Sequence, residues 1–325
     1  GKTAYPKFQE KLQVCRDLFH GYDFSKFYTG TPLEKAQAIT GGVNFVLDAK
    51  APKRKELFVK EALLLRQAQS LCSSMTTEEE RHTAAYFEAV RSAVVKITMG
   101  GGNGKPLSLK EINSQINELL KASIQSEGVI NLFESAKMGE KFSLFDPAVL
   151  EEIARMKEKN IVVEILRKLM AEQIAIYKRT NVVQATTFSD KITLLMNTYY
   201  NGLITNEEVI KELLKTAEEI NALRKEGEKL GLSEEELAFY DALTKPEHIK
   251  DFYENETLIA LTRELTDMLR RNRTIDWQKK ETARAGMRKM VKRLLKKYKY
   301  PPEKYEDAIE TVMSQCELWT DQAEM

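Results

Sequence analysis

Residues 258–302 read LIALTRELTDMLRRNRTIDWQKKETARAGMRKMVKRLLKKYKYPP, and this stretch decides how the rest of the chain is interpreted. Within residues 281–299 the apolar side chains recur at steps of three and four, which places them on one face of an α-helix. These side chains are Ala283, Met287, Met290, Val291, Leu294, Leu295 and Tyr298. Pro301 and Pro302 should end the helix, because a residue that precedes proline is pushed out of the α region. The stretch therefore predicts a helix with one face in a hydrophobic core.

The same stretch is densely basic on its other side. Arg284, Arg288, Lys292 and Lys296 step by four along a second helix face, Lys289, Arg293 and Lys297 widen it, and Arg270, Arg271 and Arg273 precede it. Cations in this arrangement could hold a DNA backbone without reading its sequence, or bind an acidic protein surface. We take these ten residues as the candidate contacts to DNA or to a protein partner.

The charge of the remaining chain leaves a third possibility open. The formal net charge is only +1, yet residues 263–300 hold fourteen Lys and Arg against four acids, so the rest of the chain carries −9. Much of that deficit lies in residues 207–256, with fifteen acids against seven Lys and Arg, and in residues 301–325, with seven acids against Lys304 alone. The basic helix is thus equally open to neutralisation inside the fold by an ion-pair network.

Several strings of the sequence together resemble a known protein family. They are TIDW at 274–277, VKRLLKKYKYPP at 291–302, GYDFS at 21–25, YFEAVR at 86–91, NIVVE at 160–164 and GLSEEELAFYDAL at 231–243. In their order along the chain they resemble the C-terminal region of the restriction (R, or HsdR) subunit of type I restriction-modification enzymes. The resemblance covers most of the chain. None of the strings is a catalytic motif, so the match rests on their number and order.

The resemblance implies a role without catalysis for this chain. In the family, this all-helical region follows the second motor lobe of an ATP-dependent double-stranded DNA translocase and endonuclease, and it is associated with docking the R subunit onto a methyltransferase core of M and S subunits. ATP and Mg²⁺ belong to other domains of such a protein, so no cofactor is expected here. Double-stranded DNA is a possible second partner. A module that holds the DNA backbone during translocation is the alternative function.

The pattern of the whole chain predicts an all-α fold without a sheet, because nearly every segment has helix period and no run alternates like a strand. Helix starts are marked by capping boxes, in which a Ser or Thr is followed three residues later by Glu. They stand at Thr31, Thr77, Ser108, Thr205 and Ser233, and Asp146 precedes Pro147 in a similar role. A further helix is expected to begin at Ser189 and to end at Asn201 and Gly202.

Residues 98–107 (TMGGGNGKPL) contain four glycines and a proline, a composition that cannot continue a helix. We interpret them as a linker between an N-terminal helical subdomain, residues 1–97, and a C-terminal helical subdomain, residues 108–325. A phosphate-binding loop is excluded, because Met99 stands where the first glycine is needed and Pro106 replaces the hydroxyl residue.

Other signals for chemistry are weak. Asp48-Ala49-Lys50 has the spacing of half a nuclease motif but lacks a preceding strand, so a solvated helix end is expected. His20, His82 and His248 are too far apart for a metal-binding pair on one helix face, and we expect no metal site. Trp277 and Trp319 are expected in the core rather than stacked on bases. A hydrolase unrelated to the family would need catalytic groups converging from loops, and no such motif is visible.

The three cysteines are few, odd in number and widely spaced, which is typical of reduced thiols. No apolar run approaches the roughly 20 residues of a spanning helix. We therefore expect a cytoplasmic protein. Gly1 in place of Met suggests a fragment of a longer protein, although processing would also produce a chain that opens on glycine.

Overall fold

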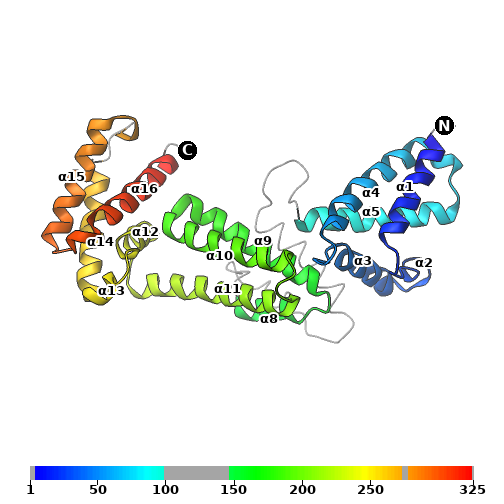
Figure 1. Cartoon of the computed structure of the whole chain (residues 1–325), viewed down its shortest axis with the longest axis horizontal. Helices are drawn as coiled ribbons and strands as arrows, with labels where there is room; N and C mark the ends of the chain where they lie inside the picture. The colour runs from blue at the N-terminus through cyan, green and yellow to red at the C-terminus, as the bar shows by residue number, and fades with distance from the viewer. Residues whose placement is uncertain (1–3, 99–145, 273–276, 324–325) are drawn as a thin grey trace. The chain divides into compact units, whose positions relative to one another are not determined.

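The structure is a computed structural model that describes residues 4–98, 146–272 and 277–323. These residues form α-helices and short 3-10 helices, and no strand occurs among them, which confirms the all-α prediction (Figure 1).

In the N-terminal part of the chain the elements are α1 Ala4–Leu18, α2 Lys26–Thr29, α3 Pro32–Val46, α4 Pro52–Cys72, η1 Ser73–Met75 and α5 Glu78–Thr98. The next are α8 Pro147–Arg155, α9 Lys159–Thr180, α10 Val182–Tyr200 and α11 Asn206–Lys229. The last are α12 Glu234–Thr244, α13 Ile249–Phe252, α14 Asn255–Asn272, η3 Trp277–Lys279, α15 Glu281–Lys297, η4 Pro302–Lys304 and α16 Tyr305–Ala323.

Backbone contacts divide the chain into two compact units. Unit 1 comprises residues 1–169 and 194–215, and unit 2 comprises residues 170–193 and 216–325. Helices α9, α10 and α11 each have residues in both units. Apart from Thr98, the predicted linker at 98–107 lies outside the described residues, as does the helix predicted from Ser108. The division into subdomains at this linker stays a prediction.

Unit 1 is built around aromatic rings supplied by α4, α5 and the segment between α1 and α2. The ring of Phe19 lies 5.1 Å from that of Phe58 and 5.2 Å from that of Phe87, measured between centroids. Phe24 stacks on Tyr86 at 4.4 Å. Phe19, Phe58, Phe87 and Tyr86 are fully buried or nearly so, and rings of this size dominate the apolar area that a core removes from water.

Two consecutive glycines in α3 make room for two tyrosine hydroxyls. Tyr22 and Tyr86 both donate hydrogen bonds to the carbonyl oxygen of Ala38, at 3.2 and 3.0 Å. A Cβ atom at Gly41 would lie 2.2 Å from the Tyr22 hydroxyl, and one at Gly42 would lie 2.2 Å from the Tyr86 hydroxyl. The absence of a side chain at both positions therefore allows α3 to approach these rings.

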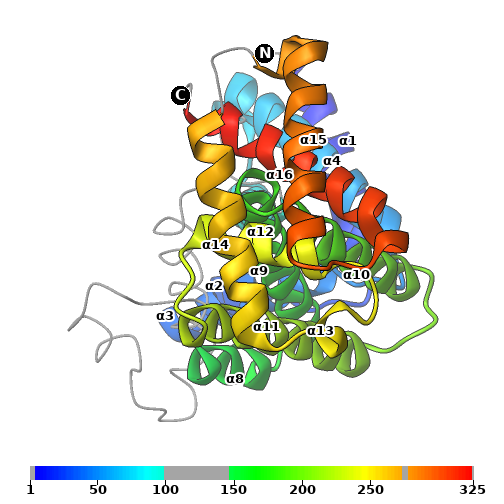
Figure 2. The same cartoon turned by 90° about the vertical axis from the view of Figure 1, so that its left-hand side faces the viewer.

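Unit 2 has a second core, to which α12, α14, α15 and α16 contribute (Figure 2). Trp277 is completely buried and Tyr300 is 1% exposed. From α16, Ile309, Val312 and Cys316 are buried, with Tyr305 and Trp319 packed beside them, so one face of the final helix lies in the core. The core fixes the orientation of α15, the predicted basic helix.

The start of α10 corrects one prediction. The helix begins at Val182 instead of Ser189, because polar side chains cap it there. Gln315 of α16 accepts a hydrogen bond from the backbone N–H of Val182 at 2.9 Å and donates one to the carbonyl of Thr180. Asn181 accepts from the backbone N–H of Gln184 at 3.1 Å. These bonds satisfy donors that a helix start leaves unpaired.

The end of α15 also differs from the prediction by two residues. The helix ends at Lys297, and Lys299 follows in the left-handed region with a φ of 54°. The backbone N–H groups of Lys299 and Tyr300 bond back to the carbonyls of Lys296 and Leu295, at 3.0 and 2.9 Å. This is the Schellman pattern that closes many helices, here with lysine in the position usually taken by glycine.

The predicted capping boxes at Thr31 and Ser233 are formed, each with its partner glutamate, and so are the reciprocal bonds at Thr77 and Thr205. Asp146 accepts from the N–H of Ala148 and caps α8 as predicted. Among the described helices, none combines the length and the apolar character needed to cross a membrane.

Candidate functional site

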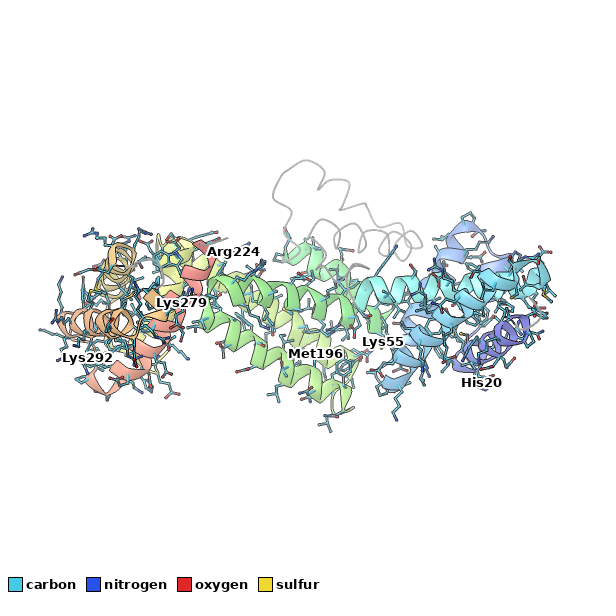
Figure 3. All side chains as sticks on the ribbon, turned by 90° about the horizontal axis from the view of Figure 1, so that it is seen from above. His20, Lys55, Met196, Arg224, Lys279 and Lys292 are labelled. Carbon is cyan, nitrogen blue, oxygen red and sulfur yellow. The ribbon has the colours of Figure 1, made fainter. Side chains whose placement is uncertain are left out.

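Helix α15 turns one face to the core of unit 2 and the other to solvent. Met287, Val291 and Leu295 are buried, whereas every Lys and Arg of the helix is exposed. Figure 3 labels Lys292 on the outer side of the helix. The amphipathic helix predicted from the spacing of these residues is confirmed, and the predicted contact residues on it are accessible.

Three of the predicted contact residues lie beside acids of α16. Arg284 Nη2 is 2.9 Å from Glu317 Oε1, Arg288 Nη2 is 3.5 Å from Glu306 Oε2, and Lys292 Nζ is 3.7 Å from Glu306 Oε1. Glu317 Oε1 is buried and accepts no aligned hydrogen bond from a described residue, so Arg284 is the cation that offsets its charge. Pairs this exposed contribute about 0–1 kcal/mol each. These ion pairs position the three cations beside α16 and add little to the stability of the fold.

On the opposite edge of α15, Lys297 is held by α14. Its amine lies 2.6 and 2.8 Å from the two carboxylate oxygens of Glu264, and the hydroxyl of Tyr298 donates to the same carboxylate at 2.7 Å. The hydrogen bonds from Lys297 and then Tyr298 lower the pKa of Glu264, and the bond to Glu264 raises the pKa of Tyr298 to about 12. This edge is therefore a second intramolecular link.

Arg270, near the end of α14, is also engaged within the chain. Its guanidinium pairs with Glu235 at 2.9 Å and with Asp267 at 3.3 Å, and it lies 5.8 Å from the ring of Trp319. The Trp319 indole donates to Glu235 at 3.0 Å. The arginine thus closes a contact between α12, α14 and α16. Arg273 lies outside the described residues.

The remaining predicted cations are not neutralised in this way. Arg271, Lys289, Arg293 and Lys296 are exposed, and none of them forms an ion pair with any residue that the structure describes. Lys289, Arg293 and Lys296 are spaced by four and three, so they share the outward face of α15 over a rise of about 10 Å. We call these three residues the outer strip.

Carboxylates of the neighbouring helices are paired with the other cations of α15. Glu306 and Glu317 of α16 pair with Arg284, Arg288 and Lys292, and Glu264 of α14 pairs with Lys297. The candidate surface is therefore a narrow row of cations beside cations that acids of the same chain already neutralise. A long polyanion would meet few cations there that are open to it.

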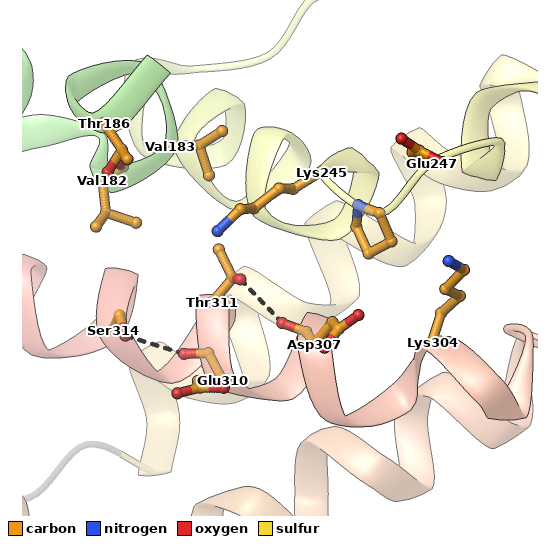
Figure 4. Close-up of a pocket in the computed structure, with 11 residues that line it drawn as sticks. Val182, Val183, Thr186, Lys245, Glu247, Lys304, Asp307, Glu310, Thr311 and Ser314 are labelled. Carbon is orange, nitrogen blue, oxygen red and sulfur yellow. Dashed lines mark hydrogen bonds between the residues drawn. The ribbon is translucent and has the colours of Figure 1, made fainter. Parts of the chain in front are cut away.

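Unit 2 also contains an open cleft of about 530 Å³ that the sequence did not indicate. Its walls come from the start of α10, the loop after α12 and the first turns of α16: Val182, Val183, Thr186, Lys245, Pro246, Glu247, Lys304, Asp307, Glu310, Thr311 and Ser314. Lys245 reaches toward the space between Val183 and Thr311 (Figure 4). Because two lysines and three carboxylates line the same cleft, it favours neither an anion nor a cation.

The other sequence signals have structural explanations. Trp277 is buried, and Trp319 packs edge-on against Phe239 at 5.6 Å, which agrees with the core interpretation. Asp48 accepts a hydrogen bond from the backbone of Lys50 in the turn after α3, so this spacing marks a helix end. No group of three or more His, Cys, Asp or Glu suited to a metal ion occurs in the part of the chain that the structure describes.

Sequence reasoning missed the individual residues that divide the cations into two groups. Glu264, Glu306 and Glu317 pair with four of the predicted cations on α15. Glu306 and Glu317 lie in the acidic segment at 301–325, whereas Glu264 is one of the few acids within the basic stretch. The surplus showed that pairing was possible. Which cation is paired depends on how α14 and α16 pack beside α15, which no local pattern records.

Comparison with known proteins places these observations in a family. The profile described as "Type I restriction enzyme HindI endonuclease subunit-like, C-terminal" matches residues 2–322. The type I restriction enzyme HindI endonuclease subunit of Haemophilus influenzae is 34% identical over 345 aligned residues, which cover 97% of this chain. The putative type I restriction enzyme MjaIXP endonuclease subunit of Methanocaldococcus jannaschii is 27% identical over 77% of this chain.

The chain spans only part of these relatives, 32% of the first and 24% of the second. No solved structure matches the chain. The profile covers nearly every residue, and the order of the matching strings noted in the sequence agrees with it. The chain therefore belongs to the family of C-terminal regions of type I restriction enzyme endonuclease subunits that resemble the HindI subunit.

Proposed function

We propose that this chain is a non-catalytic helical region that docks a type I restriction subunit onto its methyltransferase core of M and S subunits. The family membership supports the setting, and the outer strip of α15 supports the docking. Lys289, Arg293 and Lys296 are held in one row on a helix whose opposite face is fixed by the core of unit 2. Like charges at this spacing repel one another by a few tenths of a kcal/mol per pair. A partner of opposite charge removes that repulsion.

An acidic protein surface fits this row better than DNA does. A duplex presents phosphates on a surface much broader than one helix, whereas the other cations of α15 are already paired with Glu264, Glu306 and Glu317. A protein can match a narrow row of positive charge, because it can place a few carboxylates opposite the row and uncharged groups beside them. The charge pattern around α15 is the observation on which the docking proposal depends.

Holding of the DNA backbone is the second candidate, since Arg271 and the outer strip are accessible cations that need no base contacts. With about four cations that form no ion pair with a described residue, such binding would be weak and would fall with salt by a slope of at most about −4 on logarithmic axes. The two candidates therefore differ in partner and in salt dependence.

We propose further that the chain neither hydrolyses ATP nor cleaves DNA and that it holds no cofactor. The phosphate-binding loop and the paired acids that these reactions require are missing from its sequence. In this proposal ATP, Mg²⁺ and the catalytic domains belong to the remainder of a longer restriction subunit, which functions in the cytoplasm.

The test is to capture the 325-residue chain on the immobilised methyltransferase assembly of its own restriction system, with and without a duplex that carries the recognition site. The docking function predicts capture in both samples. DNA holding predicts capture only with the duplex, together with binding of the chain to the same duplex alone at low salt. Docking is contradicted if the chain is captured in neither sample.

A further inference from the structure

One residue of α15, Gly286, is not explained by the residues that the structure describes. Gly286 lies in the interior of the helix, where glycine is less stable than alanine. Its φ is outside the left-handed region, and a Cβ atom built there meets no atom within 4 Å. By contrast, a Cβ atom at Gly227 of α11 would lie 2.7 Å from Leu237. Neither backbone conformation nor crowding by the described residues requires glycine at position 286.

The position of Gly286 relative to the outer strip suggests a role for glycine in binding a partner. Gly286 precedes Lys289 by three residues and Arg293 by seven, so the glycine continues the same row toward the start of the helix. The row then has a residue without a side chain at one end and cationic side chains along the rest. A surface of this kind lets another backbone approach closely at the glycine while its carboxylates meet the cations.

We propose that this row, Gly286, Lys289, Arg293 and Lys296, binds an acidic α-helix of a protein partner. The inference rests on the proposed docking function, which places that helix in the methyltransferase assembly. The spacing of three, four and three is that of one helix face, and a helix with Asp or Glu at matching steps presents its carboxylates at the same rise. A helix is also narrow, at about 10–12 Å, which suits a single row of cations.

Two substitutions of Gly286 test its effect on stability and its effect on binding. Gly286→Ala should raise the Tm of the free chain by about 2 °C, because it removes backbone entropy from the unfolded state and meets no clash. Gly286→Leu should also fold, since the space around the position is open. If a partner helix approaches there, the leucine variant should bind the methyltransferase assembly about tenfold more weakly than the unaltered chain.

The matched control is Ala222→Leu, which places the same side chain on an exposed position of α11. It should leave binding unchanged. Carbodiimide cross-linking of the complex supplies the second readout, because it joins a lysine amine to a carboxylate in direct contact. We expect Lys289 or Lys296 to be joined to Asp or Glu of a methyltransferase subunit, at sites three, four or seven residues apart.

The outcomes distinguish a failure of the acidic-helix inference from a failure of the proposed docking function. If the unaltered chain binds but Gly286→Leu binds equally well, or if the cross-links avoid Lys289 and Lys296, the acidic-helix inference is wrong and docking stands. If the unaltered chain does not bind the assembly at all, both are wrong. If Gly286→Leu weakens binding to a duplex but not to the methyltransferase, the row contacts nucleic acid and the inference is overturned.

Discussion

The hydroxyl of Tyr300 donates a 2.6 Å hydrogen bond to the backbone carbonyl oxygen of Leu243, 57 residues earlier in the chain. Leu243 lies in the last turn of α12, where carbonyl groups have no partner within their own helix. Tyr300 comes directly after the turn that ends α15 and is buried. The Tyr300 side chain thus supplies a donor for a carbonyl group at the end of α12 and fixes the position of the chain at the end of α15.

Replacing this tyrosine should therefore destabilise unit 2. Tyr300→Phe removes the donor and leaves a buried carbonyl unpaired, which should lower the free energy of unfolding by about 1–3 kcal/mol. Urea unfolding monitored by circular dichroism measures the loss. Tyr305→Phe is the control, because the Tyr305 hydroxyl has no hydrogen bond to any described residue, and it should change stability by less than about 0.5 kcal/mol. Equal effects of the two variants would contradict the role given to Tyr300.

The glycine pair of α3 makes a prediction for unit 1. Gly42→Ala places a Cβ atom 2.2 Å from the hydroxyl of Tyr86, a ring that is completely buried, so overpacking should cost about 1–3 kcal/mol. Tyr86→Phe removes the clashing oxygen. The double variant should recover part of the loss, and the deviation from additivity, measured by denaturant unfolding, reports the contact. Additive losses would show that the two residues do not meet.

Asp241 predicts a pH dependence of stability. Burial raises its pKa, although Asn181 and Gln184 donate hydrogen bonds to its Oδ2 atom at 2.7 and 2.6 Å. An acid whose pKa is raised by folding contributes stability that is fully present below its unfolded pKa of about 3.9 and is lost as pH rises through the folded pKa. At neutral pH the ionised carboxylate therefore destabilises the fold.

Asp241→Asn keeps an oxygen that can accept both hydrogen bonds but cannot ionise. The variant should be more stable than the unaltered chain at pH 7, and the difference should shrink as the pH falls toward 4. Urea unfolding at both pH values is the measurement. A variant that is less stable at pH 7, or a difference that grows on acidification, would show that the charged form is the one the site favours.

The proposal of a region without catalysis predicts the absence of turnover. The purified 325-residue chain should release no phosphate from ATP above background in the presence of Mg²⁺ and duplex DNA, and it should leave supercoiled plasmid uncut. A complete restriction subunit with its methyltransferase serves as the positive control. Turnover that co-purifies with the chain and responds to added DNA would contradict the proposal.

Features whose partners lie close in sequence could be predicted. The capping boxes at Thr31 and Ser233 join residues three apart, and the apolar face of α15 follows from its own spacing. The start of α10 could not be predicted, because its cap comes from Gln315, 133 residues after Val182. Local signals reported where most helices begin and missed a boundary that the tertiary structure sets.

The candidate site shows the same limit. Its cations and the acidic surplus around them could be read from the sequence, and the exposure of Lys289, Arg293 and Lys296 agrees with a partner-facing role. The pairing of Arg288 with Glu306 depends on where α16 lies beside α15. For this reason the sequence placed Arg288 and Lys296 on one functional face. In the structure Arg288 pairs with Glu306, whereas Lys296 forms no ion pair with a described residue.

That separation determines which charges to remove in order to test docking. Lys289→Gln, Arg293→Gln and Lys296→Gln together keep helix propensity and leave the ion pairs with α14 and α16 intact. The matched control removes three exposed lysines of α11 that have no ion pair with a described residue, as Lys211→Gln, Lys215→Gln and Lys225→Gln. Both triple variants change the net charge by the same amount.

The central measurement is a calorimetric titration of the methyltransferase assembly with the unaltered chain and with each triple variant. If the outer strip docks the chain, its variant should bind about tenfold or more weakly, as the loss of three charge pairs of about 0.5–1 kcal/mol each implies, whereas the α11 variant should bind as the unaltered chain does. Equal affinity of the outer-strip variant and the unaltered chain, or equal losses in both variants, would contradict docking through α15.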